Sequence, residues 1–519
     1  MFRRIAAALA LTMLIGFGPA IGQSRTRPLT LEECILSALK NNLNVAVQVL
    51  NPEIADYTVS QAQEKFLPTL SLAYNRQSNN SASYSWLNAS GSSITKYSSY
   101  SVNLTETVPT GGSLNLSLAS YKNDSNQRFQ TINPRFGSTL TLGFTQPLLR
   151  DFGFKMSRRQ IIIAQNNLDI SEKQFTQTLL DTIYQVEQAY WNLFFSIEDL
   201  KVKQQSLKLA QDLLANNQRA VEIGTMAPLD ILSAQAEVAT READILAAEA
   251  LVKNNQDALK TVINLAEKNQ EGTADIVPTD KPNFAEKQVS LEQSLAEAMQ
   301  NRPDLQATRI GLKNSDLNLS YAKNQLLPGL SLNASYWSPG VSGDQILYLN
   351  NDPLTGVIIG RLPGGASNAL KDAFNFRYRN WSVGLTLDFP LSSVVSRAQY
   401  ALAKATLDQD NLSLKNQEQQ VLLEIKNAVR AVQTNFKRVQ AYKVARELAE
   451  KKLQAEQEKL NVGMSTNFIV LTYQRDLATA LSAELNAIID YNLSLASLEK
   501  SQGTSLEDRN MRLTDYMKQ

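Results

Sequence analysis

Histidine and cysteine carry most acid–base, nucleophilic and metal chemistry in enzymes, and this chain of 519 residues has no histidine and one cysteine, Cys34. Without imidazole there is no Ser-His-Asp triad, no Cys-His pair and no histidine-ligated zinc. A single thiol forms neither an internal disulfide nor a cysteine metal cage. Two-carboxylate and Ser/Lys mechanisms survive, but no pair stands out from the other Glu and Lys residues. We therefore expect no enzyme, cofactor or metal site.

The charge balance of the chain argues against a nucleic-acid partner. Lys+Arg number 51 against 50 Asp+Glu, for a net charge of +1, so the chain lacks the basic excess of a nucleic-acid-binding protein. Glycine is scarce, at 22 residues, which favours long regular elements. Cys34 lies in an amphipathic run and is expected to be a small buried residue.

The N-terminus predicts export. Arg3 and Arg4 precede an apolar run over residues 5–17, and Ala20-Ile21-Gly22 has the small-x-small pattern of a cleavage site. Residues 1–22 are therefore a predicted signal peptide. A membrane anchor is the alternative, but the run is shorter than the roughly 20 residues that a spanning helix needs. No later stretch is long and apolar enough for such a helix.

The rest of the chain is predicted to be an internal two-fold repeat. Leu31-Glu32 recurs as Leu291-Glu292, at an offset of 291 − 31 = 260, and Leu67-Pro68 recurs as Leu327-Pro328 at the same offset. Gly224 and Gly463 match at 463 − 224 = 239. We expect repeats over residues 23–288 and 289–502, and a C-terminal tail over 503–519.

Each half has the same order of patterns. An amphipathic helix comes first, and we expect Pro52 or Pro303 to interrupt it. Short alternating segments follow, among long polar tracts, and this weak alternation is typical of transmembrane β-strands. The helices are predicted over 29–66 and 289–326, and the strands lie within 67–148 and 328–390, centred on 69–74, 138–144, 329–334 and 381–387.

Residues 97–121 are ambiguous. They have the pattern of a hairpin joined at Pro109-Thr110-Gly111-Gly112. The hairpin is either an extension of an extracellular loop or two added strands of the barrel. We expect the loop extension, because two extra strands would make the halves unequal.

Long helical hairpins are predicted over 155–266 and 395–502. Their first helices lack proline for about 67 residues, which corresponds to roughly 100 Å of helix. Apolar residues recur every seven positions, which indicates left-handed supercoiling against neighbouring helices. Four strands per chain cannot close a barrel, and an open edge leaves backbone groups unpaired in lipid. Three copies would supply twelve strands and twelve helices.

With these features, the sequence resembles the TolC-like outer-membrane factors, or outer membrane efflux proteins, over residues 29 to 500. The resemblance rests on the repeat, the Leu-Pro-x-Leu-Ser-Leu strand starts and the segment from Ile223 to Gln235. It implies an α+β membrane protein whose homotrimer forms a 12-stranded β-barrel in outer-membrane lipid, continued by a periplasmic α-helical coiled-coil barrel. The implied function is the exit channel of a tripartite efflux pump or type I secretion system.

The resemblance also implies partners, namely a periplasmic adaptor and an inner-membrane RND or ABC transporter. The adaptor would contact the hairpin tips, at Ile223, Gly224, Thr225, Val462, Gly463 and Met464. Independently of any partner, the two glycines would permit the positive φ of a tight turn.

The predicted periplasmic gate departs from the family pattern. Well-studied members have aspartates six and nine residues after the second tip glycine, and here these positions are Ile469 and Thr472. Asp230 stands six residues after Gly224, where the family's carboxylate bonds to the neighbouring hairpin. We expect a constriction formed by packing at Leu460, Ile469 and Thr472, with Asp230 as a latch.

The alternative function is a secreted periplasmic coiled-coil scaffold or adhesin without a pore. It would explain the signal peptide and the seven-residue period. It would not explain why each half contains paired amphipathic strands.

Overall fold

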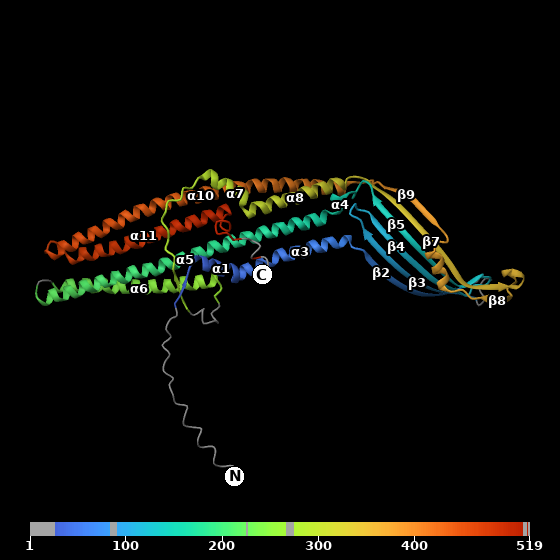
Figure 1. Ribbon diagram of the computed structural model, residues 1–519, viewed down its shortest axis with the longest axis horizontal. Coiled ribbons are helices and arrows are strands. Elements are labelled where there is room, and N and C mark those ends of the chain that lie inside the picture. The colour runs from blue at the N-terminus through green and yellow to red at the C-terminus, as the bar shows by residue number, and fades with distance from the viewer. Residues whose placement is uncertain (1–25, 84–90, 225–226, 266–273, 512–515, 517–519) are drawn as a thin grey trace, which may run out of the picture. The chain divides into compact units, whose positions relative to one another are not determined.

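The structure is a computed structural model that describes residues 26–83, 91–224, 227–265, 274–511 and 516 (Figure 1). The predicted signal peptide over residues 1–22 lies outside these residues. The chain divides into two compact units, and each takes segments from both predicted halves. The first unit comprises Met1–Leu50, Gln174–Asp304 and Glu418–Gln519, and the second comprises Asn51–Lys173 and Leu305–Gln417.

The first unit is mainly helical, and its two short strands, β1 and β6, pair in parallel. Its elements are β1 (Thr26–Leu29), α1 (Leu31–Asn41), α2 (Leu43–Gln48), α6 (Pro228–Val262), β6 (Asp275–Pro278), α7 (Leu291–Asn301) and α11 (Asn467–Gln502), with parts of α5 (Arg159–Glu222) and α10 (Val394–Asn461). The core of this unit packs Ile35 of α1 against Leu179 and Tyr190 of α5 and Ile276 of β6. Cys34 is also fully buried there, as predicted.

The two proline-free runs fold as α5, of 64 residues, and α10, of 68 residues. A helix returns beside each of them, α6 beside α5 and α11 beside α10 (Figure 1). The Asn255 side-chain amide donates to the Asn192 carbonyl at 3.1 Å in the first hairpin, and Asn435 donates to the Asp490 carbonyl at 3.2 Å in the second. Among the described residues, no helix is both long enough and apolar enough to cross a membrane.

The first amphipathic segment is interrupted twice, once earlier than predicted. Asn42 ends α1 and caps α2, with its side-chain oxygen accepting from the backbone N–H of Asn44 at 2.8 Å. A second break falls at Val49, between α2 and α3 (Leu50–Gln63), and Pro52 lies in the first turn of α3, so the predicted interruption at Pro52 is confirmed to within one turn. A proline in the first turn removes no intrahelical hydrogen bond and is tolerated there. The predicted break at Pro303 is confirmed, because Pro303 starts α8 (Pro303–Asn324).

The second unit is built on a seven-stranded antiparallel sheet. Its strands are β2 (Thr69–Ala82), β3 (Ser92–Thr107), β4 (Ser113–Ser125), β5 (Ile132–Pro147), β7 (Gly329–Tyr348), β8 (Ile358–Leu362) and β9 (Asn380–Asp388). The unit also contains α4 (Phe154–Ser157), α9 (Ala366–Phe374), most of α3 and α8, parts of α5 and α10, and the 3₁₀ turns η1 (Glu64–Phe66), η2 (Leu349–Asn351) and η3 (Pro353–Thr355).

The predicted loop extension over residues 97–121 is wrong. These residues lie in β3 and β4, which stand between β2 and β5 as full members of the sheet (Figure 1). The pairing of β2 with β3 runs without interruption from Thr69↔Thr105 to Ala82↔Ser92. Of the seven strands in this sheet, six have nine or more residues, enough to cross a bilayer, and β8 is shorter at five.

Cross-strand register explains why the hairpin joins the sheet. Alternate residues of all six long strands place apolar side chains on one face, which we call the apolar face. Across β2 to β5 one row reads Leu72↔Val102, Val102↔Leu118 and Leu118↔Leu140. Leu332 of β7 pairs with Leu385 of β9 on the same face. The opposite face, which we call the polar face, carries mainly Ser, Thr and Asn, including Ser71, Asn103, Ser117, Thr141, Asn333 and Thr386.

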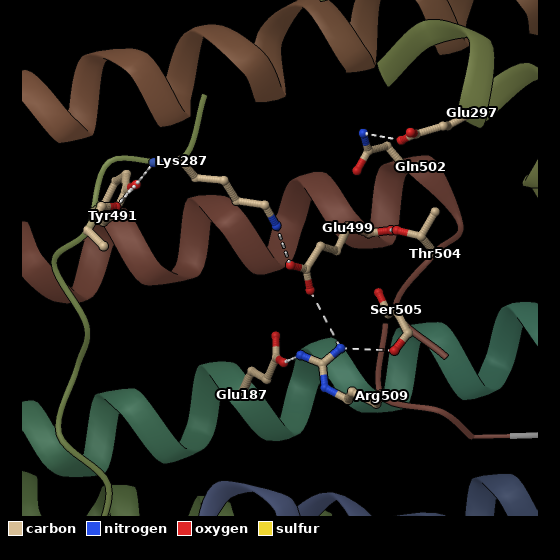
Figure 2. Close-up of polar contacts among 10 residues, drawn as sticks. Glu187, Lys287, Glu297, Tyr491, Glu499, Gln502, Thr504, Ser505 and Arg509 are labelled. Carbon is tan, nitrogen blue, oxygen red and sulfur yellow. Dashed lines mark hydrogen bonds and ion pairs between the residues drawn. The ribbon is translucent and has the colours of Figure 1, made fainter. Parts of the chain in front are cut away.

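The C-terminal tail is anchored in the first unit through Arg509 (Figure 2). Its guanidinium donates to the Glu187 carboxylate of α5 and lies 3.5 Å from the Glu499 carboxylate of α11. Lys287 contacts the other Glu499 oxygen at 3.1 Å. Leu506 of the tail is buried in the core. The segment after α11 is therefore a packed part of the unit, held by charge and by apolar contact.

Glu187 is the buried charge in this cluster, with 3% of its surface exposed. Burial raises the pKa of the Glu187 carboxyl to about 7, and Arg509 only partly offsets this effect. The folded chain therefore holds this proton more tightly than the unfolded chain does. The resulting stabilisation is complete below pH 4.5 and is lost as the pH rises through 7.

We predict that Glu187→Gln removes this pH dependence. Between pH 5 and pH 8 the natural chain should lose on the order of 2 kcal/mol of stability relative to the variant, because the variant never ionises at this site. Thermal unfolding of the detergent-solubilised protein at both pH values measures the difference. Parallel pH dependence of the two proteins would contradict the assigned burial of Glu187.

Candidate functional site

The first candidate tip is the turn between α5 and α6. Gly224 follows the end of α5 with φ of 76°, and its N–H donates to the Val221 carbonyl at 3.0 Å. A Cβ on Gly224 would meet no atom within 4 Å, so glycine is required for its φ alone. Pro228 then begins α6 at the position where its missing N–H costs nothing. Thr225 lies outside the described residues.

The second tip, between α10 and α11, has the same backbone geometry. Gly463 has φ of 77°, and the N–H of Met464 donates to the Lys459 carbonyl at 2.8 Å, which closes the end of α10. Ser465 donates to Glu456 at 2.5 Å and ties the turn to α10. This hydrogen bond and the one from Lys459 hold the pKa of Glu456 below its usual value.

Both tips present large apolar side chains to solvent. Ile223 is 75% exposed at the first tip, and Met464 is 77% exposed at the second. Val462 and Phe468 are also exposed at the second tip, and Leu229 at the first. Exposed apolar groups at the closed end of a helical hairpin are typical of a surface that binds another protein.

The predicted gate residues lie close to the tips. Leu460 is in the last turn of α10, Ile469 and Thr472 are in the first two turns of α11, and Asp230 is in the first turn of α6. All four are half-buried. The Thr472 hydroxyl donates to the Phe468 carbonyl of its own helix at 2.8 Å. Within the described part of the chain, no hydrogen bond or ion pair joins the Asp230 carboxylate to the second hairpin.

The hairpins are instead joined by Arg241 of α6, which the sequence analysis missed. Its side chain is 5% exposed. The guanidinium donates to the Ser206 carbonyl of α5 at 2.6 Å and to the Leu471 carbonyl of α11 at 3.3 Å. It also lies 3.0 Å from the Glu237 carboxylate, which neutralises the buried charge. Arg241 therefore links the first hairpin to the second. It also donates to the Gln474 side chain of α11 at 3.5 Å, five residues after Ile469.

A second link lies further from the tips. The Ser482 hydroxyl of α11 donates to the Asp199 carboxylate of α5, and Lys203 lies 3.2 Å from the same carboxylate. A seven-residue spacing in the sequence of α6 could have indicated the Arg241 link. Ala234, Arg241 and Ala248 recur every seven residues, and all three are buried in the chain. A charge inside a seam of small residues indicates a buried polar contact.

The apolar stripe of α6 is a different set of residues and is exposed. It has 3-4 spacing and comprises Leu229, Leu232, Ala236, Ala239, Ala243, Leu246 and Ala250. These side chains do not pack within the chain. Elsewhere, the described residues contain no group of three or more Asp, Glu or Cys that could hold a metal ion.

Comparison with known proteins covers nearly the whole chain. A profile of the family described as Outer membrane efflux protein matches residues 34–265 and 294–504. The Outer membrane protein TolC of Vibrio cholerae is 24% identical over 385 residues, which cover 72% of this chain and 79% of that protein.

Solved structures share the fold. The Campylobacter jejuni CmeC outer membrane channel aligns with a TM-score of 0.64 at 16% identity, covering 94% of this chain and 89% of that one. The open state of the Neisseria gonorrhoeae MtrE outer membrane channel aligns with a TM-score of 0.60 at 20% identity, covering 91% and 88%. At these identities the likeness concerns the mixed α/β fold.

We predict that Arg241→Met destabilises the protein by about 3 kcal/mol, because it leaves the half-buried Glu237 carboxylate without its partner. Arg241→Met combined with Glu237→Leu should recover most of this loss, since no uncompensated charge remains. Thermal unfolding of the three proteins in detergent measures both effects. Equal stability of the natural chain and the single variant would contradict the buried link.

Proposed function

We propose that this chain, which belongs to the outer membrane efflux protein family, is the exit duct of a tripartite efflux pump or of a type I secretion system. It passively conducts substrate that an inner-membrane transporter and a periplasmic adaptor deliver. The amphipathic sheet with two unpaired edges is the observation that carries this proposal.

Membership of this family establishes the general class and location of the protein. The chain is an outer-membrane channel protein with its helices in the periplasm, and it is not an enzyme. In this setting the apolar face of the sheet meets lipid and the polar face meets water. The polar face carries many hydroxyl and amide groups, which suit a passive water-filled path.

The two edges of the sheet support assembly into a closed barrel. β2 and β9 are edge strands, and each has an unpaired row of backbone N–H and C=O groups. Such a row cannot remain unpaired in lipid. Because the strands alternate in direction and six of them span, β2 and β9 run in opposite directions. We propose that β9 of one copy pairs antiparallel with β2 of the next, which closes a ring.

The strand count revises the size of the barrel. Three copies, as in a homotrimer, would contribute six spanning strands each and make eighteen rather than the expected twelve. A wider barrel follows, since barrel diameter grows with strand number. The exposed stripe of α6 supports the same assembly, because close packing against a helix of a second copy would bury it.

At the tips, we propose that an adaptor binds Ile223, Gly224, Val462, Gly463 and Met464, with Thr225 completing the first tip. Their apolar exposure supports this assignment. We further propose that Leu460, Ile469 and Thr472 form the constriction, and that Asp230 bonds to a hairpin of another copy. Arg241 would then hold the two hairpins of one copy together while the constriction is closed.

A coiled-coil scaffold without a pore is the other candidate. The family assignment and the lipid-compatible face of the sheet both disfavour it. No described feature favours it over a channel.

The edge pairing predicts an intermolecular disulfide. Ser71→Cys on the polar face of β2 should cross-link to Ser382→Cys, Gly384→Cys or Thr386→Cys on β9 of another copy. Cys34 will not interfere, because it is buried and its pKa is raised to about 12. Non-reducing gels of outer membranes then show covalent dimers and trimers.

Ser101→Cys in the interior strand β3 is the matched control and should give no cross-link with the same β9 variants. Absence of any β2–β9 cross-link in a protein present in the outer membrane would contradict the pairing.

The gate predicts insensitivity to trivalent cations. The natural channel in a planar bilayer should conduct equally with and without them on the periplasmic side, because Ile469 and Thr472 offer no carboxylate. The double substitution Ile469→Asp and Thr472→Asp should create a block. Strong block of the natural channel would overturn the proposed apolar constriction.

A further inference from the structure

The apolar face of the sheet ends at two borders that differ in charge. The proximal border is the one at which β2 begins, next to the helices. The distal border is the one toward which β2 runs. The last apolar positions before the distal border carry aromatic rings, including Tyr74, Tyr100 and Trp381. Tyr74 and Tyr100 are cross-strand partners with ring centroids 4.9 Å apart. Aromatic rings at this position mark the membrane–water interface.

Beyond the aromatic rings, cations occupy the apolar-face positions of four strands. We call them the cationic row, which comprises Arg76 of β2, Lys96 of β3, Lys122 of β4 and Arg379 just before β9. The positions follow from the alternation of side chains, since Arg76 is two residues past Tyr74 and Arg379 is two residues before Trp381. All four side chains are exposed.

On β5 and β7 the same level is covered by α9. Small residues allow α9 to pack closely on these strands. Ala369 of α9 is fully buried, and a Cβ on Gly340 of β7 would clash with the Ala369 carbonyl oxygen at 2.1 Å. Phe376, after α9, packs against Tyr336 of the apolar face, with 5.6 Å between the ring centroids. The helix presents Lys371 to solvent, so the cationic level continues across these two strands.

One carboxylate on this side faces the row, and it lies opposite one of the four cations. Asp124 stands opposite Lys96 in register, and Asp372 pairs with Arg377 at 3.2 Å. Among the described residues, no carboxylate lies within ion-pair distance of the four cations of the row. At the proximal border the apolar-face strand positions carry one carboxylate, Glu106, and, among the strand residues described, no lysine or arginine.

We infer that the cationic row binds the phosphate groups of an anionic glycolipid in the outer leaflet of the membrane. This inference rests on the proposed function, because that places the distal border outside and the helices in the periplasm. Arginine and lysine at the headgroup level pair with phosphate while their stems and the adjacent rings contact acyl chains. On the apolar face of the strands themselves, lysine and arginine among the described residues occur only toward the distal border. This distribution fits a membrane whose outer leaflet alone carries phosphorylated glycolipid.

Assembly would concentrate this charge. When β9 of one copy pairs with β2 of the next, Arg379 and Arg76 of adjacent copies meet at the same border. Two guanidinium groups side by side repel each other, and a phosphate bound between them would offset this repulsion. The seam between copies is therefore the strongest position in the row for a phosphate.

The test compares glycolipid binding by the natural protein and by a variant with Arg76→Gln, Lys96→Gln, Lys122→Gln and Arg379→Gln. Purified protein in detergent is titrated with a bisphosphorylated acylated glucosamine disaccharide, and bound lipid is counted by native mass spectrometry. The row variant should bind at least ten-fold more weakly. A matched control neutralises four exposed lysines of the helices, at Lys208, Lys253, Lys404 and Lys451, and should bind as the natural protein does.

Three further probes fix the ligand chemistry. The dephosphorylated disaccharide, phosphatidylglycerol and inorganic phosphate at millimolar concentration should each bind or compete far more weakly. Equal binding of any of them, or unchanged glycolipid binding by the row variant, would overturn the assignment.

Conductance in phosphatidylcholine bilayers separates this inference from the proposed function. The row variant should conduct like the natural protein, which shows that it is folded and assembled. If the natural protein conducts normally but binds the glycolipid no better than the other probes, the inference about the cationic row is overturned and the proposed function stands. Absence of conductance in the natural protein would overturn the proposed function instead, and with it the orientation that the inference requires.

Discussion

The need to pair every backbone polar group in lipid constrains this molecule more than any other factor. Within one chain, β2 and β9 each leave one edge open, although the sheet already has an apolar face. An open edge costs several kcal/mol for each unpaired group in hydrocarbon. The even number of spanning strands gives the two edges opposite directions. In the proposed assembly, closure of the barrel and a lumen lined by the polar face both follow from that requirement, whereas the number of copies does not.

Much of the fold was predictable because its periods are simple. Alternation identified the strands around Leu70, Leu140, Leu330 and Leu385, and the absence of proline identified α5 and α10. The role of residues 97–121 could not be predicted from the sequence, because a hairpin has the same alternation whether it extends a loop or joins a sheet. Only its register with β2 and β5, residue for residue, decides between the two.

The candidate site shows the same limit. The positive φ of Gly224 and Gly463 follows from glycine between helices, and the structure confirms it. The link through Arg241 was missed because a charge on a helix is usually solvated, and only the packing of α6 against α11 shows that this one is buried. The roles of Asp230, Leu460, Ile469 and Thr472 depend on surfaces that other copies would contribute, so they remain predictions.

A cross-section of the assembled protein tests the central claim most directly. Electron cryo-microscopy of the channel in lipid nanodiscs can count the strands around the membrane-embedded barrel. For the proposed homotrimer, closure by edge pairing predicts eighteen strands, with β9 of each copy beside β2 of the next. A twelve-stranded barrel, or a barrel in which β3 and β4 lie outside the wall, would contradict the account.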